Sequence, residues 1–323
     1  MISSLALYTC KLKIITGYGN MVNKIKAELE KHITIDSNAT LKLLIDMIAN
    51  ANRVNDIGGD IVVFTMWESS VLPNSAKWLK NAKLIIVPSN YNKEIFHNNG
   101  LRLVSVVPLG VDTQIYYKKD IEKSVCTFGI AGSFFPRKNF PFIVNAFKKA
   151  FVGKEAFLKI KTSPLIDDPK FQYLKEHHPQ IQIIARHLAE SEMCEWYNSL
   201  DAFISCSHSE GFGLHQLEAM ACGIPMISPK FGGVTEFFDE TVGYCVDYKI
   251  TDASNYIYNG KWCSAIEESL IDKMMIVYNN RNKAKELGLR ARDRATFFTW
   301  NHTVSKLINK LNKYVSLNKS LCE

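Results

Sequence analysis

The chain has 323 residues, 47% of them hydrophobic and 22% charged, and this length exceeds what one hydrophobic core usually holds, so two domains are expected. The two fractions are those of a soluble globular protein, and no apolar run reaches the roughly 18 residues that a membrane-spanning helix needs. The net charge of +7 is shared between the two halves of the chain, which excludes a nucleic-acid-binding tail.

Two further features bear on the compartment. The eight cysteines are scattered singly, without the Cys-x-x-Cys spacing of a zinc or redox site, so we interpret them as reduced core residues. Residues 1–10 are mildly apolar but lack the basic leader of a signal peptide. We therefore expect a cytoplasmic protein, and the modest positive charge leaves open a peripheral contact with an anionic membrane surface.

The first half of the chain predicts an alternation of strands and helices. A Gly-Tyr-Gly turn at residues 17–19 separates the first strand from the first helix. The predicted strands cover residues 11–16, 60–66, 83–87 and 103–107, and the predicted helices cover residues 20–31, 38–51, 75–81 and 91–98. Strand, glycine turn and helix are the opening of an α/β unit.

A charged stretch at residues 116–124 is the predicted linker, and the alternation restarts after it. The predicted strands cover residues 125–131, 157–161, 182–185, 201–205 and 225–228. The predicted helices cover residues 140–151, 214–221, 263–279, 281–297 and 300–314. Repeated alternation predicts parallel sheets in both halves.

Glu218 is the residue that says most about function. On the helix over residues 214–221, Leu214, Leu217 and Ala221 form an apolar stripe, and Glu218 lies at the i+4 position of that stripe. Burying a carboxylate costs several kcal/mol unless strong donors meet it. The common explanation for a lone glutamate of this kind is a buried lysine or arginine partner. The alternative is a bound polyol or cation.

The turn before that helix favours the second explanation. Gly211 and Gly213 carry no side chain, so a ligand can approach the backbone closely, and the amides of a helix start attract phosphate. The two hydroxyls of a ribose can each donate a hydrogen bond to a carboxylate. Phosphate and ribose together indicate a nucleotide.

Two other places could carry chemistry. Arg137 and Lys138 lie between a predicted strand and a predicted helix, at the sheet edge where α/β proteins bind ligands, although such a pair alone is usually a solvated surface feature. Trp67 and Glu68 end a strand in the first half and form a plausible sugar-binding surface, although packing is the commoner explanation.

No metal site is expected. Asp167 and Asp168 precede a proline and are interpreted as a solvated turn, since no histidine or cysteine cluster supports them. His208 is the histidine nearest to the glycine turn, and its role stays open.

The segment from Glu210-Gly-Phe-Gly through Glu218-Ala-Met-Ala-Cys-Gly-Ile-Pro resembles the signature of family-4 retaining glycosyltransferases, the glycosyl transferases of group 1. The resemblance implies an α/β protein of the B fold, in which two Rossmann-like domains face a cleft. It implies a shortened acceptor-side domain at residues 1–117, a nucleotide-sugar-binding domain at residues 118–298 and a last helix at residues 299–323 that returns to the first domain.

In this resemblance Glu218 holds the ribose and Glu210 grips hydroxyls of the transferred sugar. The backbone amides of the glycine turn, at Gly211, Phe212, Gly213 and Leu214, cradle sugar and phosphate. Lys138 matches a lysine that contacts the donor phosphates.

The chain also departs from the family pattern. Ser133 stands where relatives have an arginine, and Arg137 is the candidate substitute. Gly17 and Gly19 resemble the glycine loop of the first domain, and residues 232–236 resemble a second glycine turn beside the donor. The histidine that many relatives carry near Trp67 is missing, which leaves the catalytic group of that domain open.

The resemblance implies a retaining transfer of a hexose, without metal or cofactor, from a UDP- or GDP-linked sugar to a glycan, lipid or protein acceptor. No nucleic acid is expected as a partner. Two alternatives stay open: a non-catalytic nucleotide-sugar-binding protein, and an epimerase or phosphorylase of the same fold. A DNA-modifying glucosyltransferase is disfavoured because the sequence has no basic stripe.

Overall fold

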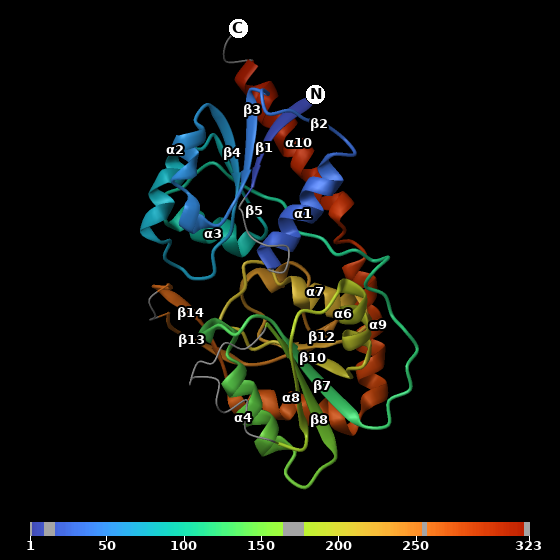
Figure 1. The fold of residues 1–323 in the computed structure, drawn as a ribbon. Coiled ribbons are helices and arrows are strands. Elements are labelled where there is room, and N and C mark those ends of the chain that lie inside the picture. Colours follow the sequence, from blue (N-terminus) through green and yellow to red (C-terminus); the bar gives the residue numbers. More distant parts are fainter. Residues whose placement is uncertain (1, 10–16, 164–177, 254–256, 320–323) are drawn as a thin grey trace.

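The fold is taken from a computed structural model, and the residues whose structure is described are 2–9, 17–163, 178–253 and 257–319. Two six-stranded sheets lie one above the other, each with helices against it (Figure 1). Neighbouring strands in both sheets are parallel. The two-domain α/β fold that the sequence predicts is therefore confirmed.

The first domain is built on the sheet with strand order β2-β1-β3-β4-β5-β6. Its strands are β1 Ser4–Thr9, β2 Thr34–Ile35, β3 Leu41–Ile45, β4 Asp60–Phe64, β5 Leu84–Val87 and β6 Val104–Val106. Its helices are α1 Gly17–Leu29, α2 Arg53–Ile57 and α3 Asn90–Asn98, with 3-10 turns η1 Ile48–Asn50 and η2 Asn74–Asn81.

The second domain has strand order β12-β11-β10-β7-β8-β9 and a separate antiparallel hairpin, β13-β14. Its strands are β7 Cys126–Ala131, β8 Ala156–Thr162, β9 Ile181–Ala185, β10 Ala202–Ile204, β11 Met226–Ser228, β12 Gly243–Cys245, β13 Tyr248–Asp252 and β14 Lys261–Ala265. Its helices are α4 Phe140–Ala150, α6 Glu190–Asn198, α7 Leu214–Ala221, α8 Glu267–Asn279 and α9 Arg281–Ala295, with 3-10 turns η3 Pro136–Lys138 and η5 Gly232–Glu236.

Two predicted helices need correction, and one predicted strand lies outside the described residues. The predicted helix at residues 38–51 is wrong, because strand β3 occupies its middle. A buried parallel strand is apolar on both faces, and a short apolar run does not separate strand from helix. The predicted helix at residues 263–279 begins too early, since residues 261–265 form β14 and the helix starts at Glu267. The predicted strand at residues 11–16 lies outside the described residues, and β1 precedes it.

The last helix, α10 Trp300–Lys319, packs along α1 on the right-hand side of the first domain in Figure 1. Val304, Leu307 and Leu311 are buried in one cluster with apolar residues of α1. The connection into α10 lies against the segment that leaves the first domain: Val111 donates its backbone N–H to Phe298 O at 2.8 Å. The chain therefore passes between the domains twice at one place.

Two general features complete the fold. In the part of the chain that the structure describes, no helix has the length and apolar character to span a bilayer. The six described cysteines are free, and all except Cys245 are buried.

Candidate active site between the two domains

The glycine turn between β10 and α7 brings the predicted site residues to the face of the second domain that meets the first. Helix α7 has the predicted bounds, and Glu218 on it is 7% exposed. Gly213 precedes the helix with φ +108°, a conformation that side chains rarely adopt. Phe212 is buried in the core, whereas Leu214 is partly exposed.

Glu218 has polar neighbours but no lysine or arginine within ion-pair distance among the described residues. Its Oε2 accepts a hydrogen bond from the Tyr197 hydroxyl at 2.8 Å and lies 3.1 Å from His215 Nδ1. Its Oε1 has no hydrogen-bond partner in the described chain. Burial, followed by the nearby Glu218 charge, raises the pKa of Tyr197, so Tyr197 stays a neutral donor. The Glu218 carboxylate is thus fixed on one side and available on the other.

Glu210 is the glutamate that cations neutralise. Its Oε1 lies 2.6 Å from Lys138 Nζ, and its Oε2 lies 3.0 Å from Arg137 Nη1. Arg137 Nη2 also lies 3.5 Å from Oε1 of Glu68, which belongs to the first domain. We call Glu68, Arg137, Lys138 and Glu210 the charge cluster. It places two acids beside two bases across the domain boundary.

The pKa shifts within the charge cluster follow from this geometry. Burial raises the pKa of Glu210, but Arg137 and then Lys138 outweigh it and hold that pKa well below its usual value. Burial lowers the pKa of Arg137, and the charges of Glu210 and Glu68 more than reverse the effect. For Lys138, burial prevails over the attraction of Glu210, so its pKa is lowered. Glu210 is therefore ionised at any pH near neutrality.

Arg137 keeps one polar atom without a partner. Its Nη1 also donates to the backbone oxygen of Ser209, and its guanidinium lies 6.0 Å from the centre of the Tyr258 ring. Its Nε is buried and has no hydrogen-bond partner among the described residues. An unpaired buried donor of this kind costs about 1–3 kcal/mol, which an incoming oxygen acceptor would recover.

The second predicted glycine turn, η5, packs directly on the first. Gly233 donates its N–H to Glu210 O at 2.7 Å, and a Cβ at Gly233 would lie 2.1 Å from Gly211 O. The same carbonyl of Gly211 accepts hydrogen bonds from Ser89 Oγ at 2.9 Å and Asn92 Nδ2 at 3.1 Å in the first domain. The backbone around Gly211 is therefore fixed from both domains.

Replacing Gly233 with alanine is expected to lower the free energy of unfolding by about 1–3 kcal/mol, because neither backbone can move away from the added methyl group. Gly17→Ala is the matched control, since a Cβ there meets no described atom within 4 Å and alanine favours helix. Chemical denaturation of both variants measures the difference. Equal stabilities would contradict a tight contact between η5 and the glycine turn.

Of the other predicted site residues, only some lie near the charge cluster. Gly17 and Gly19 belong to the first turn of α1 and so do not form a loop within the described residues. Ser133 is exposed, and its side chain forms no hydrogen bond with the charge cluster among the described residues. Trp67 is buried, and its Nε1 donates to Ser69 Oγ and Val71 O, so it packs the first domain. Glu68 alone of the acceptor-side pair reaches the charge cluster.

His208 has a structural environment. Its Nδ1 lies 2.7 Å from Cys263 O, and its ring stacks on Trp262 with centroids 4.5 Å apart. Burial lowers its pKa, against the opposing effect of the hydrogen bond to Cys263 O. The predicted acidic turn at Asp167 and Asp168 lies outside the described residues. Within them, no group of three or more His, Cys, Asp or Glu side chains could hold a metal.

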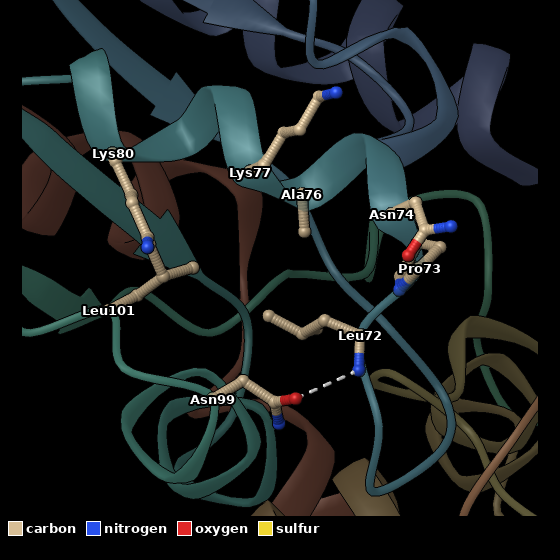
Figure 2. Close-up of a pocket in the computed structure, with 8 residues that line it drawn as sticks. All are labelled: Leu72, Pro73, Asn74, Ala76, Lys77, Lys80, Asn99 and Leu101. Atoms are coloured by element: carbon tan, nitrogen blue, oxygen red, sulfur yellow. Dashed lines mark hydrogen bonds between the residues drawn. The ribbon is translucent and has the colours of Figure 1, made fainter.

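A surface pocket of about 430 Å³ lies on the first domain, beside the loop that carries Glu68. Figure 2 shows Leu72, Ala76, Asn99, Lys80 and Leu101 around it, with Leu72 N–H donating to Asn99 Oδ1 at 3.2 Å. The pocket contains no member of the charge cluster and is separate from the candidate active site.

Sequence reasoning missed Tyr197, His215 and Tyr258. Tyr197 lies on α6, where apolar residues recur at helical spacing and so indicate a helix in the sequence. His215 is three residues before Glu218, within one helical turn. Tyr258 comes from the connection between β13 and β14, and no local pattern indicates that this connection reaches the first domain.

Comparisons with known proteins bear on the family and the fold. The model of the family described as glycosyl transferases group 1 matches residues 117–294. A probable sucrose-phosphate synthase of Thermosipho melanesiensis is 28% identical over 182 residues, 50% of this chain and 42% of that protein. An uncharacterized glycosyltransferase of Methanocaldococcus jannaschii is 25% identical over 226 residues, 69% of this chain and 58% of that protein. The chain thus spans about half the length of these curated relatives.

Solved structures show the same fold over nearly the whole chain. HepE of Anabaena in complex with UDP-glucose superposes with a TM-score of 0.72 at 13% identity. The superposition covers 97% of this chain and 100% of the HepE chain. Sucrose-phosphate synthase from Thermosynechococcus elongatus superposes with a TM-score of 0.68 at 15% identity. The superposition covers 93% of this chain and 79% of the synthase chain. At these identities the likeness concerns the fold.

Proposed function

The chain belongs to the glycosyl transferases group 1 family and has the two-domain B-type fold, and from these premises we propose that it transfers a hexose from a nucleoside-diphosphate sugar to an acceptor. The proposal includes retention at the anomeric carbon, no metal and no cofactor. A donor linked to UDP or GDP is proposed, and the UDP-glucose bound by HepE supports the first of these. The acceptor is a glycan, a lipid or a protein.

The observation that carries the proposal is the environment of Glu218. Glu218 is 7% exposed and has no lysine or arginine within ion-pair distance among the described residues, where hydrogen bonds reach only its Oε2. A carboxylate in such a place is costly unless donors satisfy it. A ribose diol would supply donors to Oε1. Tyr197 and His215 hold the carboxylate in place for that contact.

The charge cluster supplies the chemistry in this proposal. Lys138 and Arg137 stabilise the negative charge that develops on the departing diphosphate. This is the largest expected contribution to catalysis, because no protein nucleophile is evident among the described residues. Glu210 holds hydroxyls of the transferred sugar. The donor must compete with Glu210 for both cations, so binding requires a rearrangement within the cluster.

A second candidate is a nucleotide-sugar-binding protein without turnover. The closed charge cluster favours it, because both bases are already paired with acids of the protein. The serine at position 133 and the missing first-domain histidine also favour a binding protein without turnover. An epimerase of this fold would differ in releasing no nucleotide while still altering the sugar.

Thermal unfolding with UDP-, GDP- and ADP-linked sugars tests the proposal. A matching donor at 100 times its dissociation constant is expected to stabilise the protein by about 2.7 kcal/mol. Release of nucleoside diphosphate with an acceptor pool then separates a transferase from a binding protein. No stabilisation by any of the donors would contradict the proposed function.

A further inference from the structure

The β13-β14 hairpin of the second domain is fastened to the first domain. Val71 and Asn259 form an antiparallel β-bridge, Ser70 N–H donates to Lys261 O at 3.0 Å, and Lys261 N–H donates to Ser70 Oγ at 2.7 Å. Gly260 has φ +90°, and a Cβ there would lie 2.4 Å from Ser70 Oγ. Figure 1 shows the hairpin on the side of the second domain that faces the first.

This attachment places Tyr258 against the charge cluster. The Tyr258 ring lies 4.9 Å from the Trp67 ring and 5.9 Å from the Trp262 ring. Its hydroxyl donates to Glu68 Oε2 at 3.3 Å, while the other oxygen of Glu68 faces Arg137 at 3.5 Å. Burial raises the pKa of Tyr258, so the hydroxyl keeps its proton at neutral pH.

The contacts form a chain from the hairpin to the candidate phosphate-binding group. Tyr258 holds one oxygen of Glu68 with its hydroxyl, while its ring lies 6.0 Å from the Arg137 guanidinium. Glu68 attracts one amino group of Arg137, and Arg137 retains a buried Nε without a partner in the described chain. A change in the position of Glu68 would therefore move or reorient the guanidinium. Such positioning matters, because charge-assisted contacts to phosphate depend on the guanidinium geometry.

We propose that Tyr258 is a positioning residue, which orients Arg137 toward the donor diphosphate by holding Glu68. The β13-β14 hairpin is then the element that fixes this arrangement when the domains are together. The inference rests on the proposed function and extends it to a residue outside the donor-binding turn.

Tyr258→Phe removes only the hydroxyl and keeps the ring between Trp67 and Trp262. We expect the dissociation constant for UDP, measured by calorimetry, to rise roughly threefold to tenfold, less than the loss of a direct hydrogen bond to a charged group. Tyr248→Phe is the matched control on the same hairpin, because its ring packs on Phe231 and its hydroxyl forms no hydrogen bond with the charge cluster among the described residues. This variant should bind UDP like the wild type.

A double-mutant cycle with Glu68→Gln separates positioning from general packing. If Tyr258 acts through Glu68, the added effect of Tyr258→Phe on UDP binding should fall below about twofold in the Glu68→Gln background. Equal effects in both backgrounds, or an unchanged affinity of Tyr258→Phe beside a wild type that binds UDP, would overturn the inference and leave the proposed function standing. A wild type that binds no nucleoside diphosphate would overturn both.

Discussion

Glu218→Gln is expected to weaken nucleoside-diphosphate and nucleotide-sugar binding by roughly 10- to 100-fold, with little change in the stability of the ligand-free protein. Hydrogen bonds to a charged group contribute about 1.5–3 kcal/mol each, and the substitution removes the charge from the proposed ribose contact. The amide oxygen of glutamine can still accept from Tyr197, so the network inside the protein is largely kept. Calorimetry with UDP and thermal unfolding without ligand measure the two quantities.

The opposite pattern would identify a structural role for Glu218. In that case the ligand-free protein would change its stability by more than about 1 kcal/mol, while UDP affinity stayed the same. Glu195→Gln is a suitable control, because its side chain is 67% exposed and, among the described residues, forms an ion pair with Lys119 alone. Such a surface pair contributes about 0–1 kcal/mol, so neither quantity should move.

The part of the site that could be predicted from the sequence is the part built within one strand-turn-helix unit. Apolar spacing predicts the bounds of α7, the glycines indicate the turn, and Glu218 is recognisable because it interrupts an apolar stripe. Local spacing carries this information because the residues that create the environment are neighbours in the chain. The resemblance to group 1 glycosyltransferases adds roles to the same residues.

The charge cluster could not be predicted in the same way. Its members come from segments as far apart as Glu68 and Glu210, and their pairing depends on how two domains meet. From the sequence, Arg137 and Lys138 were predicted to bind the diphosphate of the donor. In the ligand-free protein both side chains instead form ion pairs with Glu210. The helix predicted over residues 38–51 was wrong for another reason that local sequence does not show. Strand β3 is buried on both faces, and this burial removes the alternation of apolar and polar residues that would identify a strand.

Glu210→Gln is expected to destabilise the ligand-free protein by about 3–5 kcal/mol, because it leaves two largely buried cations, Arg137 and Lys138, with one acid between them. In the wild type the pKa of Glu210 lies below its unfolded value. Its stabilisation is therefore fully present above about pH 4.5 and is lost as the pH falls toward the folded-state pKa. The variant should lack this acid-dependent loss.

A diphosphate should reverse much of this destabilisation. In the wild type Glu210 competes with the ligand for Arg137 and Lys138, whereas in Glu210→Gln the ligand supplies the missing negative charge. We therefore expect UDP to raise the melting temperature more in the variant than in the wild type, although sugar transfer falls by about 100-fold because the hexose is no longer held in place. Glu240→Gln, which breaks an exposed pair with Lys230, should show neither effect. A smaller response to UDP in Glu210→Gln would mean that the cations and the diphosphate do not meet, and the charge cluster would then be an interdomain contact without a role in donor binding.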